Sequence, residues 1–181
     1  KTGQLDAYEV KIITRSGEER TALQSMRATE FDGEPCWLFA VRDIEVRAPS
    51  WLEGSAMHYR LVYESLTRRN VYAYSRWAAA PSEMLRVALR RMLETDVAGD
   101  GRACRLDIEI DEFIHDYERP DRARALLTGR ALLMDSRGQR VLARLPFAIS
   151  EAATNPDAAG GVAAMVRAVD VLGRHVAAWM D

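Results

Sequence analysis

The sequence has almost no lysine, no marked excess of either charge and no long apolar run. Only Lys1 and Lys11 are lysines, and 25 basic residues face 27 acidic ones, which gives a formal net charge of −2. A chain so close to neutral has no global field to recruit nucleic acid or an anionic membrane. No stretch approaches the roughly 18 uninterrupted apolar residues that a membrane helix needs. The sequence therefore predicts no nucleic-acid partner and no membrane-spanning segment.

Cysteine is also scarce, and Cys36 and Cys104 lie far apart without a C-x-x-C pattern. This spacing indicates neither a zinc site nor a disulfide framework, although one long-range disulfide stays open. The chain begins Lys-Thr-Gly-Gln, with no apolar signal segment and no N-terminal cysteine. We therefore expect that any export signal has been removed or never existed, and composition alone indicates no compartment.

The chain has 181 residues, so we expect one domain, or one domain with a small extra piece, and its 48% of apolar residues can bury a sizeable core. The first 46 residues contain three extended stretches, separated by the turn sequences RSGEE and FDGEP. These stretches are residues 7–14, 20–28 and 36–46. They predict a three-stranded meander.

The next part of the chain predicts a hairpin and then a helix. Residues 57–63 and 70–76 have strand patterns and are joined by the loop SLTRRN. Pro81 suits the first position of a helix, and apolar residues then follow at helical spacing until Gly99 and Gly101 end the pattern. We expect a helix over about 81–96.

Three further strands are predicted at 104–117, 122–134 and 139–149, joined by tight turns. They form an antiparallel meander. The apolar alternation of the first strand slips by one residue before Phe113, which predicts a β-bulge near Asp111 and Glu112. Pro146 cannot donate to a strand ladder, so the last strand is expected at a sheet edge or bulged there.

The clearest helix closes the chain, over about 157–180, with Asn155 as its N-cap and Pro156 at its first position. One stripe is expected to pack on the sheet beside Leu85, Leu89 and Met92. The stripe consists of Val162, Met165, Val166, Val169, Leu172, Val176 and Trp179. The opposite side carries small residues among charged ones, and we interpret it as solvated; its alanines are Ala164, Ala168 and Ala178.

Together these elements predict an α/β (α+β) fold of two layers: a largely antiparallel sheet with both helices on one face. The element order is β-β-β-α-β-β-β-α, counted from the strand at 36–46. The N-terminal hairpin is expected to extend this sheet. Residues 1–44 then form a β-meander extension, and residues 45–181 form the main domain.

Asp107, Glu109 and Asp111 repeat at every second position, so they share one face of a strand and could hold a hard cation. A turn near Pro120 would instead place Glu109 opposite Arg130, and His115 opposite Arg124. The first of these is an ordinary surface charge pair. We therefore predict no metal site.

No catalytic motif is visible. The three histidines lie on separate elements, and the chain contains no H-E-x-x-H, no G-x-S-x-G and no phosphate-binding glycine loop. We predict no catalytic residue and no cofactor. A hydrolase that uses His58 or His115 stays open as a hypothesis, and it requires a nucleophile beside one of them.

Aromatic residues are concentrated, with six of them within 27 positions: Trp51, Tyr59, Tyr63, Tyr72, Tyr74 and Trp77. Tyr72 and Tyr74 would share one face of a regular strand. Such residues fill cores, but they also suit half-exposed interfaces. The candidate binding residues are Trp51, Tyr72, Tyr74, Arg76 and Trp77, and we expect at least two of the four aromatic rings to stay partly exposed on one patch.

A family resemblance rests on three segments and the closing helix. The segments are VRAPSWLEGSAMHYRLVY at 46–63, YAYSRWAAAPSEMLRVALRRML at 72–93 and LDIEIDEFIHDY at 106–117. Over about 45–181 the chain resembles the ABC-type transport auxiliary lipoprotein family, whose members serve MCE-type and paraquat-inducible intermembrane transport systems. The resemblance implies a non-enzymatic periplasmic subunit, anchored to the outer membrane in its precursor by a lipid that this chain lacks. Its implied partners are an MCE protein, an ABC permease and an ATPase, with lipid or another hydrophobic cargo.

Residues 8–44 bear a different resemblance. The segment YEVKIITRSGEERTALQSMRATEFDGEPCWLFAVRDI is similar to the last three strands of a PAS domain. The earlier PAS elements that wall a ligand pocket are missing, so neither flavin nor haem is implied. The alternative function is therefore a PAS-like sensing or dimerisation module.

Overall fold

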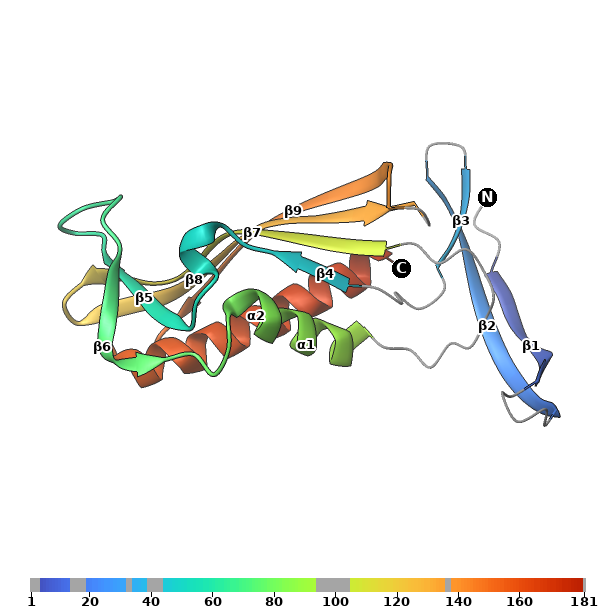
Figure 1. Cartoon of the computed structure of the whole chain (residues 1–181), viewed down its shortest axis with the longest axis horizontal. Helices are drawn as coiled ribbons and strands as arrows, with labels where there is room; N and C mark the ends of the chain where they lie inside the picture. The colour runs from blue at the N-terminus through green and yellow to red at the C-terminus, as the bar shows by residue number, and fades with distance from the viewer. Residues whose placement is uncertain are drawn as a thin grey trace.

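The structure is a computed structural model of the chain. It describes residues 4–13, 19–31 and 34–38 by their backbone, and residues 44–93, 105–135 and 138–180 in full (Figure 1). Cys36 belongs to a range described by its backbone alone, and Cys104 lies outside the described residues. The disulfide between them therefore stays an open question.

The described strands form two separately hydrogen-bonded sheets. The smaller is antiparallel and consists of β1 (Gln4–Ile13), β2 (Glu19–Phe31) and β3 (Glu34–Leu38). It confirms the predicted N-terminal meander. The larger has six strands: β4 (Ile44–Arg47), β5 (Ala56–Leu61), β6 (Asn70–Arg76), β7 (Arg105–Arg119), β8 (Arg122–Met134) and β9 (Val141–Ala152).

Two predictions about the N-terminal region are wrong. The expected strand at 36–46 is two strands in different sheets, β3 and β4, and residues 39–43 between them lie outside the described residues. The N-terminal hairpin does not extend the main sheet, because β3 pairs with β2 whereas β4 runs parallel to β7. An alternating pattern indicates that a segment is extended, but it does not indicate the strand with which the segment pairs.

The long strand β7 is the centre of the main sheet. One of its sides pairs antiparallel with β8 along its length, and the other side is shared by β4 near Ile108 and β5 near His115, both parallel. The order β6-β5-β7-β8-β9 leaves β9 at an edge, as Pro146 predicts. The predicted bulge is present as a register shift between Ile110 and Glu112. The sheet is thus mixed but mostly antiparallel, which confirms the predicted α+β class.

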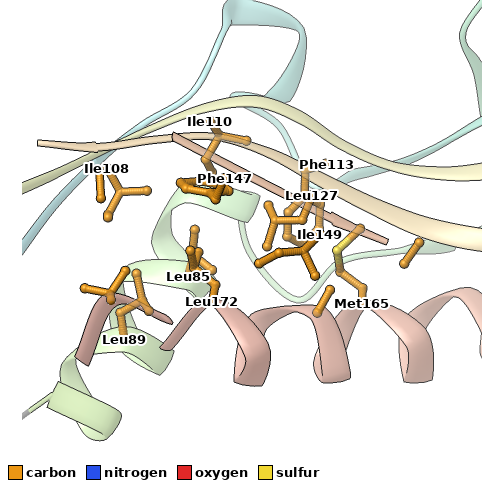
Figure 2. Close-up of a cluster of buried hydrophobic side chains, with 14 of the residues drawn as sticks. Leu85, Leu89, Ile108, Ile110, Phe113, Leu127, Phe147, Ile149, Met165 and Leu172 are labelled. Atoms are coloured by element: carbon orange, nitrogen blue, oxygen red, sulfur yellow. The ribbon is translucent and has the colours of Figure 1, made fainter. Parts of the chain in front are cut away.

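Helices α1 (Pro81–Leu93) and α2 (Ala158–Met180) cover one face of the main sheet, as predicted (Figure 1). Helix α1 begins at Pro81, and its predicted end at 96 lies outside the described residues. Figure 2 shows the aliphatic core between the two layers, where Leu85 and Leu89 of α1 meet Leu172 of α2 under the sheet. None of the helices in the described ranges is long and apolar enough to cross a bilayer.

The buried face of α2 is rotated from the predicted stripe. Met165, Leu172 and Val176 are buried as expected, but Val166 is 56% exposed and Ala168 is fully buried. Val162 and Met92 are also exposed, and Ala164 is fully buried. The small residues Ala164 and Ala168, at i, i+4 spacing, allow the helix backbone to approach β8 and β9 closely, so this part of the predicted solvated side is packed. Ala178, near the end of the helix, is exposed as predicted.

The start of α2 also differs from the prediction. The side-chain Oδ1 of Asp157 accepts a hydrogen bond of 2.7 Å from the backbone N–H of Gly160, which makes Asp157 the N-cap. The helix therefore begins at Ala158 instead of Pro156. Asn155 and Asp157 are equally good N-caps in general, so residue type could not decide between them.

Candidate functional site

The predicted binding residues lie on a short 3₁₀-helix, η1 (Ser50–Leu52), and on β6 and the residue that follows it. Tyr74 is fully exposed and Arg76 is exposed, whereas Trp51, Tyr72 and Trp77 are half-buried. By exposure, the five residues thus fall into two groups: Tyr74 and Arg76 at the surface, and the other three partly buried. Whether these residues form one binding patch stays a prediction.

The two tryptophans pack against the core. Trp51 meets the ring of His58 edge to face, with 5.2 Å between ring centroids, and the guanidinium of Arg69 lies 4.3 Å from the centre of the Trp51 ring. Trp77 packs edge to face on Phe113 at 5.3 Å. Both side chains therefore contribute to packing as well as to the surface.

Tyr72 belongs to a cluster of hydrogen-bonded rings, which we call the hydroxyl chain: His115, Tyr72 and Tyr117. The Tyr72 hydroxyl lies 2.7 Å from His115 Nδ1 and 2.8 Å from the Tyr117 hydroxyl. The Tyr117 hydroxyl in turn donates to the carbonyl oxygen of Pro156 at 3.0 Å. Sequence reasoning placed Tyr72 in a binding site but missed the two partners that hold it.

The direction of the hydroxyl chain follows from the number of protons. A carbonyl can only accept, so the single Tyr117 proton goes to Pro156 and the Tyr117 oxygen accepts from Tyr72. The single hydroxyl proton of Tyr72 is then donated to Tyr117, so the Tyr72 oxygen must accept a hydrogen bond from His115 Nδ1. His115 therefore carries its proton on Nδ1, and its Nε2 is a buried acceptor with no partner among the described residues.

Three local features place these rings together. The bulge before Phe113 puts His115 and Tyr117 on the face of β7 that meets the helices. Tyr59 of β5 lies beside them, with its ring centroid 4.6 Å from that of Tyr72. Gly161 of α2 leaves room for the imidazole, since a Cβ there would lie 2.5 Å from His115 Nδ1.

Burial favours the neutral forms of these rings. It lowers the pKa of His115 below its ordinary value of 6.5, and it raises the pKa of Tyr72 above its ordinary value of 10.0. Burial lowers the pKa of His58 as well. The hydrolase hypothesis requires a serine or cysteine hydrogen-bonded to His58 or His115. In the described part of the chain, neither histidine forms such a bond.

The opposite face of β7 carries buried acids paired with arginines. Asp116, only 1% exposed, accepts two hydrogen bonds of 2.9 Å from Arg60 of β5. Asp107 accepts bonds of 2.6 and 2.8 Å from Arg105 of its own strand. Two bonds in parallel hold each pair in one geometry.

The predicted cross-strand pairs are half right. Glu109 lies opposite Arg130 and forms an ion pair with it, as predicted. His115 lies opposite Ala125 instead of Arg124, because the bulge after Ile110 advances the register by one residue. In the ranges that the structure describes, no group of three His, Cys, Asp or Glu side chains could hold a metal ion.

The family was decided by comparison with known proteins. A family model described as ABC-type transport auxiliary lipoprotein component matches residues 32–177. The chain belongs to this family. The match begins before the predicted boundary at 45 and includes β3. No curated protein matches the chain.

Two solved structures share the auxiliary-component fold. Protein XCC0632 from Xanthomonas campestris, of the DUF330 family, has a TM-score of 0.66 and 22% identity, over 76% of this chain and 82% of that chain. The crystal structure of an uncharacterized protein has a TM-score of 0.61 and 16% identity, over 76% of this chain and 89% of that chain. At these identities the likeness shows the fold alone.

One open groove of the auxiliary component adjoins the predicted site. It has a volume of about 360 Å³ and lies beside Trp51, Pro49 and Asp111, with Arg47 and Arg130 at its sides. Arg130 is paired with Glu109, and Arg47 is paired with Glu45 and Asp107. Because its cations already have partners, the groove offers little free positive charge to an anionic ligand.

Proposed function

We propose that this chain is a non-catalytic periplasmic subunit of an MCE-type ABC transport system. It acts with an MCE protein, a permease and an ATPase to move lipid or another hydrophobic cargo between membranes. The observation that carries the proposal is the family match over residues 32–177. A lipid on the precursor would hold the subunit at the outer membrane.

The surface proposed for the transport partner comprises Trp51, Tyr72, Tyr74, Arg76 and Trp77. Tyr74 and Arg76 are its free part, because both are exposed and have no ion pair or ring contact within the described residues. Exposed tyrosine and arginine are the residue types that most often dominate the energy of an interface. Trp51 and Trp77 pack on the core and Tyr72 packs on Tyr59, and all three side chains stay partly exposed.

Binding to a purified MCE-type partner tests this surface. Tyr74→Ala and Arg76→Ala should each weaken association by more than about 1 kcal/mol while leaving the thermal midpoint nearly unchanged. Val87→Ala, an exposed change on α1, is the matched control and should alter neither quantity. Wild-type affinity in both exposed variants would contradict the proposed surface, and no association at all would contradict the proposed function.

The alternative hypothesis, a PAS-like sensing or dimerisation module, concerns residues 8–44. The strands β1, β2 and β3 form a sheet that is not hydrogen-bonded to the main sheet, as expected of a separate module. Light scattering on the whole chain and on a chain that begins at Ile44 compares the two hypotheses. A dimer that depends on residues 1–43 would favour the PAS-like hypothesis.

A further inference from the structure

The open groove beside Trp51 contains the bulged residue of β7. This strand shifts its register against β8 between Ile110 and Glu112, so Asp111 is an inserted residue with no partner position on β8. An inserted residue of this kind turns its side chain out of the regular alternation. Asp111 is exposed, and it lines the groove of about 360 Å³ together with Trp51. The bulge thus places a carboxylate in the same groove as an aromatic ring.

The free charge of this groove is negative. Four charged residues line it: Arg47, Glu109, Asp111 and Arg130. Both arginines are held by acids, and Glu109 is the partner of Arg130. Asp111 forms no hydrogen bond and no ion pair within the described residues. The pKa of Arg130 is raised first by its hydrogen bond to Glu109, and the charge of Asp111 contributes least.

The Trp51 ring is fixed in place and already holds one cation. The Arg69 guanidinium lies 4.3 Å from the ring centre and is itself bound to Glu112 at 2.6 Å. Arg69 does not line the groove, so the part of the ring that faces the groove is separate from the part that Arg69 covers. A positive group in the groove would therefore meet a free carboxylate and an aromatic ring, and both attract cations.

We propose that this groove binds a lysine or arginine side chain of the transport partner. The charge of that side chain pairs with Asp111, and its stem lies along Trp51. Ala48, Pro49 and Ile110 also line the groove and supply apolar surface for the stem. The inference rests on the proposed function and deepens it, because Trp51 is already part of the surface proposed for the partner.

Association of the 181-residue chain with a purified MCE-type partner tests the inference. Asp111→Asn keeps the shape of the side chain and removes its charge, so it should weaken association about fivefold. Asp111→Glu keeps the charge and should associate more tightly than Asp111→Asn. The loss in Asp111→Asn should shrink as salt is added, because salt screens the ion pair of the wild type.

The matched control is Asp121→Asn, the same change at an exposed aspartate in the turn between β7 and β8. It should associate as the wild type does. All of these variants change exposed side chains, and an unchanged thermal midpoint confirms that each is folded.

An exchange of charges identifies the cation of the partner. Asp111→Lys should weaken association about tenfold or more, because two cations then meet in the groove. The partner is varied in turn by changing one exposed lysine or arginine at a time to glutamate. One of these partner variants should bind Asp111→Lys more tightly than it binds the wild-type chain.

Equal affinities for Asp111→Asn and Asp121→Asn would overturn the inference and leave the proposed function standing, because the partner still binds. No association with the wild-type chain would contradict both. A third outcome is that Asp111→Asn lowers sedimentation with phosphatidylcholine vesicles and leaves partner association unchanged. The groove would then bind a lipid ammonium group, and the inference would be wrong.

Discussion

The core has two halves along β7 that are stabilised by different physics. Before the bulge, Ile108 and Ile110 pack on aliphatic residues of α1 and α2, such as Leu172. Beyond it, His115 and Tyr117 use directed hydrogen bonds beside the first turns of α2. The aliphatic half tolerates any arrangement that fills its volume, whereas the aromatic half requires one arrangement of protons and rings.

Truncation in the aliphatic half should have the largest effect. Leu172→Ala removes a fully buried side chain beneath the sheet and should lower the free energy of unfolding by about 2–5 kcal/mol. Urea unfolding measures the loss. A loss below about 0.5 kcal/mol, the usual range for surface changes, would show that Leu172 is not part of the core.

In the aromatic half, the addition of one methyl group should be costly. Gly161→Ala would place a Cβ 2.5 Å from the His115 ring, so it should lower the free energy of unfolding by about 1–3 kcal/mol. Gly173→Ala meets the side chain of Met92 at 2.6 Å, and this flexible side chain can move. The cost at Gly173 should therefore be smaller. Gly54→Ala serves as the control, because its Cβ would meet only the Ala56 backbone nitrogen, at an ordinary contact distance of 4.0 Å. Equal costs at Gly161 and Gly173 would contradict a rigid aromatic half.

Removal of one hydroxyl tests how much the hydroxyl chain contributes to stability. Tyr72→Phe leaves the His115 donor and the Tyr117 acceptor without their partner, and it should cost about 1–2 kcal/mol. Tyr74→Phe removes the matching hydroxyl from an exposed ring and should be neutral within about 0.5 kcal/mol. Thermal unfolding of the two variants measures both values, and equal stabilities would show that the hydroxyl chain contributes nothing.

The smallest expected effect is a dependence on pH. Because burial lowers the pKa of His115, the unfolded chain takes up a proton at this residue before the folded chain does as pH falls. The stability from neutral His115 is thus fully present above its ordinary pKa of 6.5 and is lost as pH falls from there through the folded pKa. His115→Asn should lack this component, so its unfolding curve should vary less with pH than that of the wild type. Identical pH profiles for the two proteins would show that His115 does not titrate differently on folding.

Much of the fold could be predicted from local patterns. The bounds of β8, the start of α1 at Pro81, the bulge near Asp111 and the edge position of Pro146 were all correct. Each depends on a residue type or a periodicity that acts within a few positions. The opposition of Glu109 and Arg130 was also correct, although the count assumed an unshifted register from a turn near Pro120. The turn lies one residue later than assumed, and the two register shifts between it and Glu109 compensate for this difference.

The errors involve interactions between distant segments. The pattern of α2 favoured Val166 over Ala168 as a buried residue, since valine is the more apolar, but close approach to the sheet selects the smaller side chain. The bulge was predicted together with the pairs Glu109–Arg130 and His115–Arg124, although a bulge that lies between the two pairs allows only one of them. Applying the bulge to the later residues would also have placed His115 and Tyr117 on the helix face. Nothing local in the sequence indicated that Tyr72 would join them from β6.

One side of β7 pairs with both β4 and β5, and this arrangement also affects how the chain folds. The strands β7, β8 and β9 and helix α2 follow one another directly, so their contacts close short loops. By contrast, the pairing of β4 and β5 with β7 closes much longer loops. The Arg60–Asp116 ion pair, for example, joins residues 56 positions apart. Since long loops cost more entropy before they gain contacts, we expect residues 105–180 to form the folding nucleus. The segment 44–76 then docks late, so substitutions in β4 and β5 should accelerate unfolding more than they slow folding.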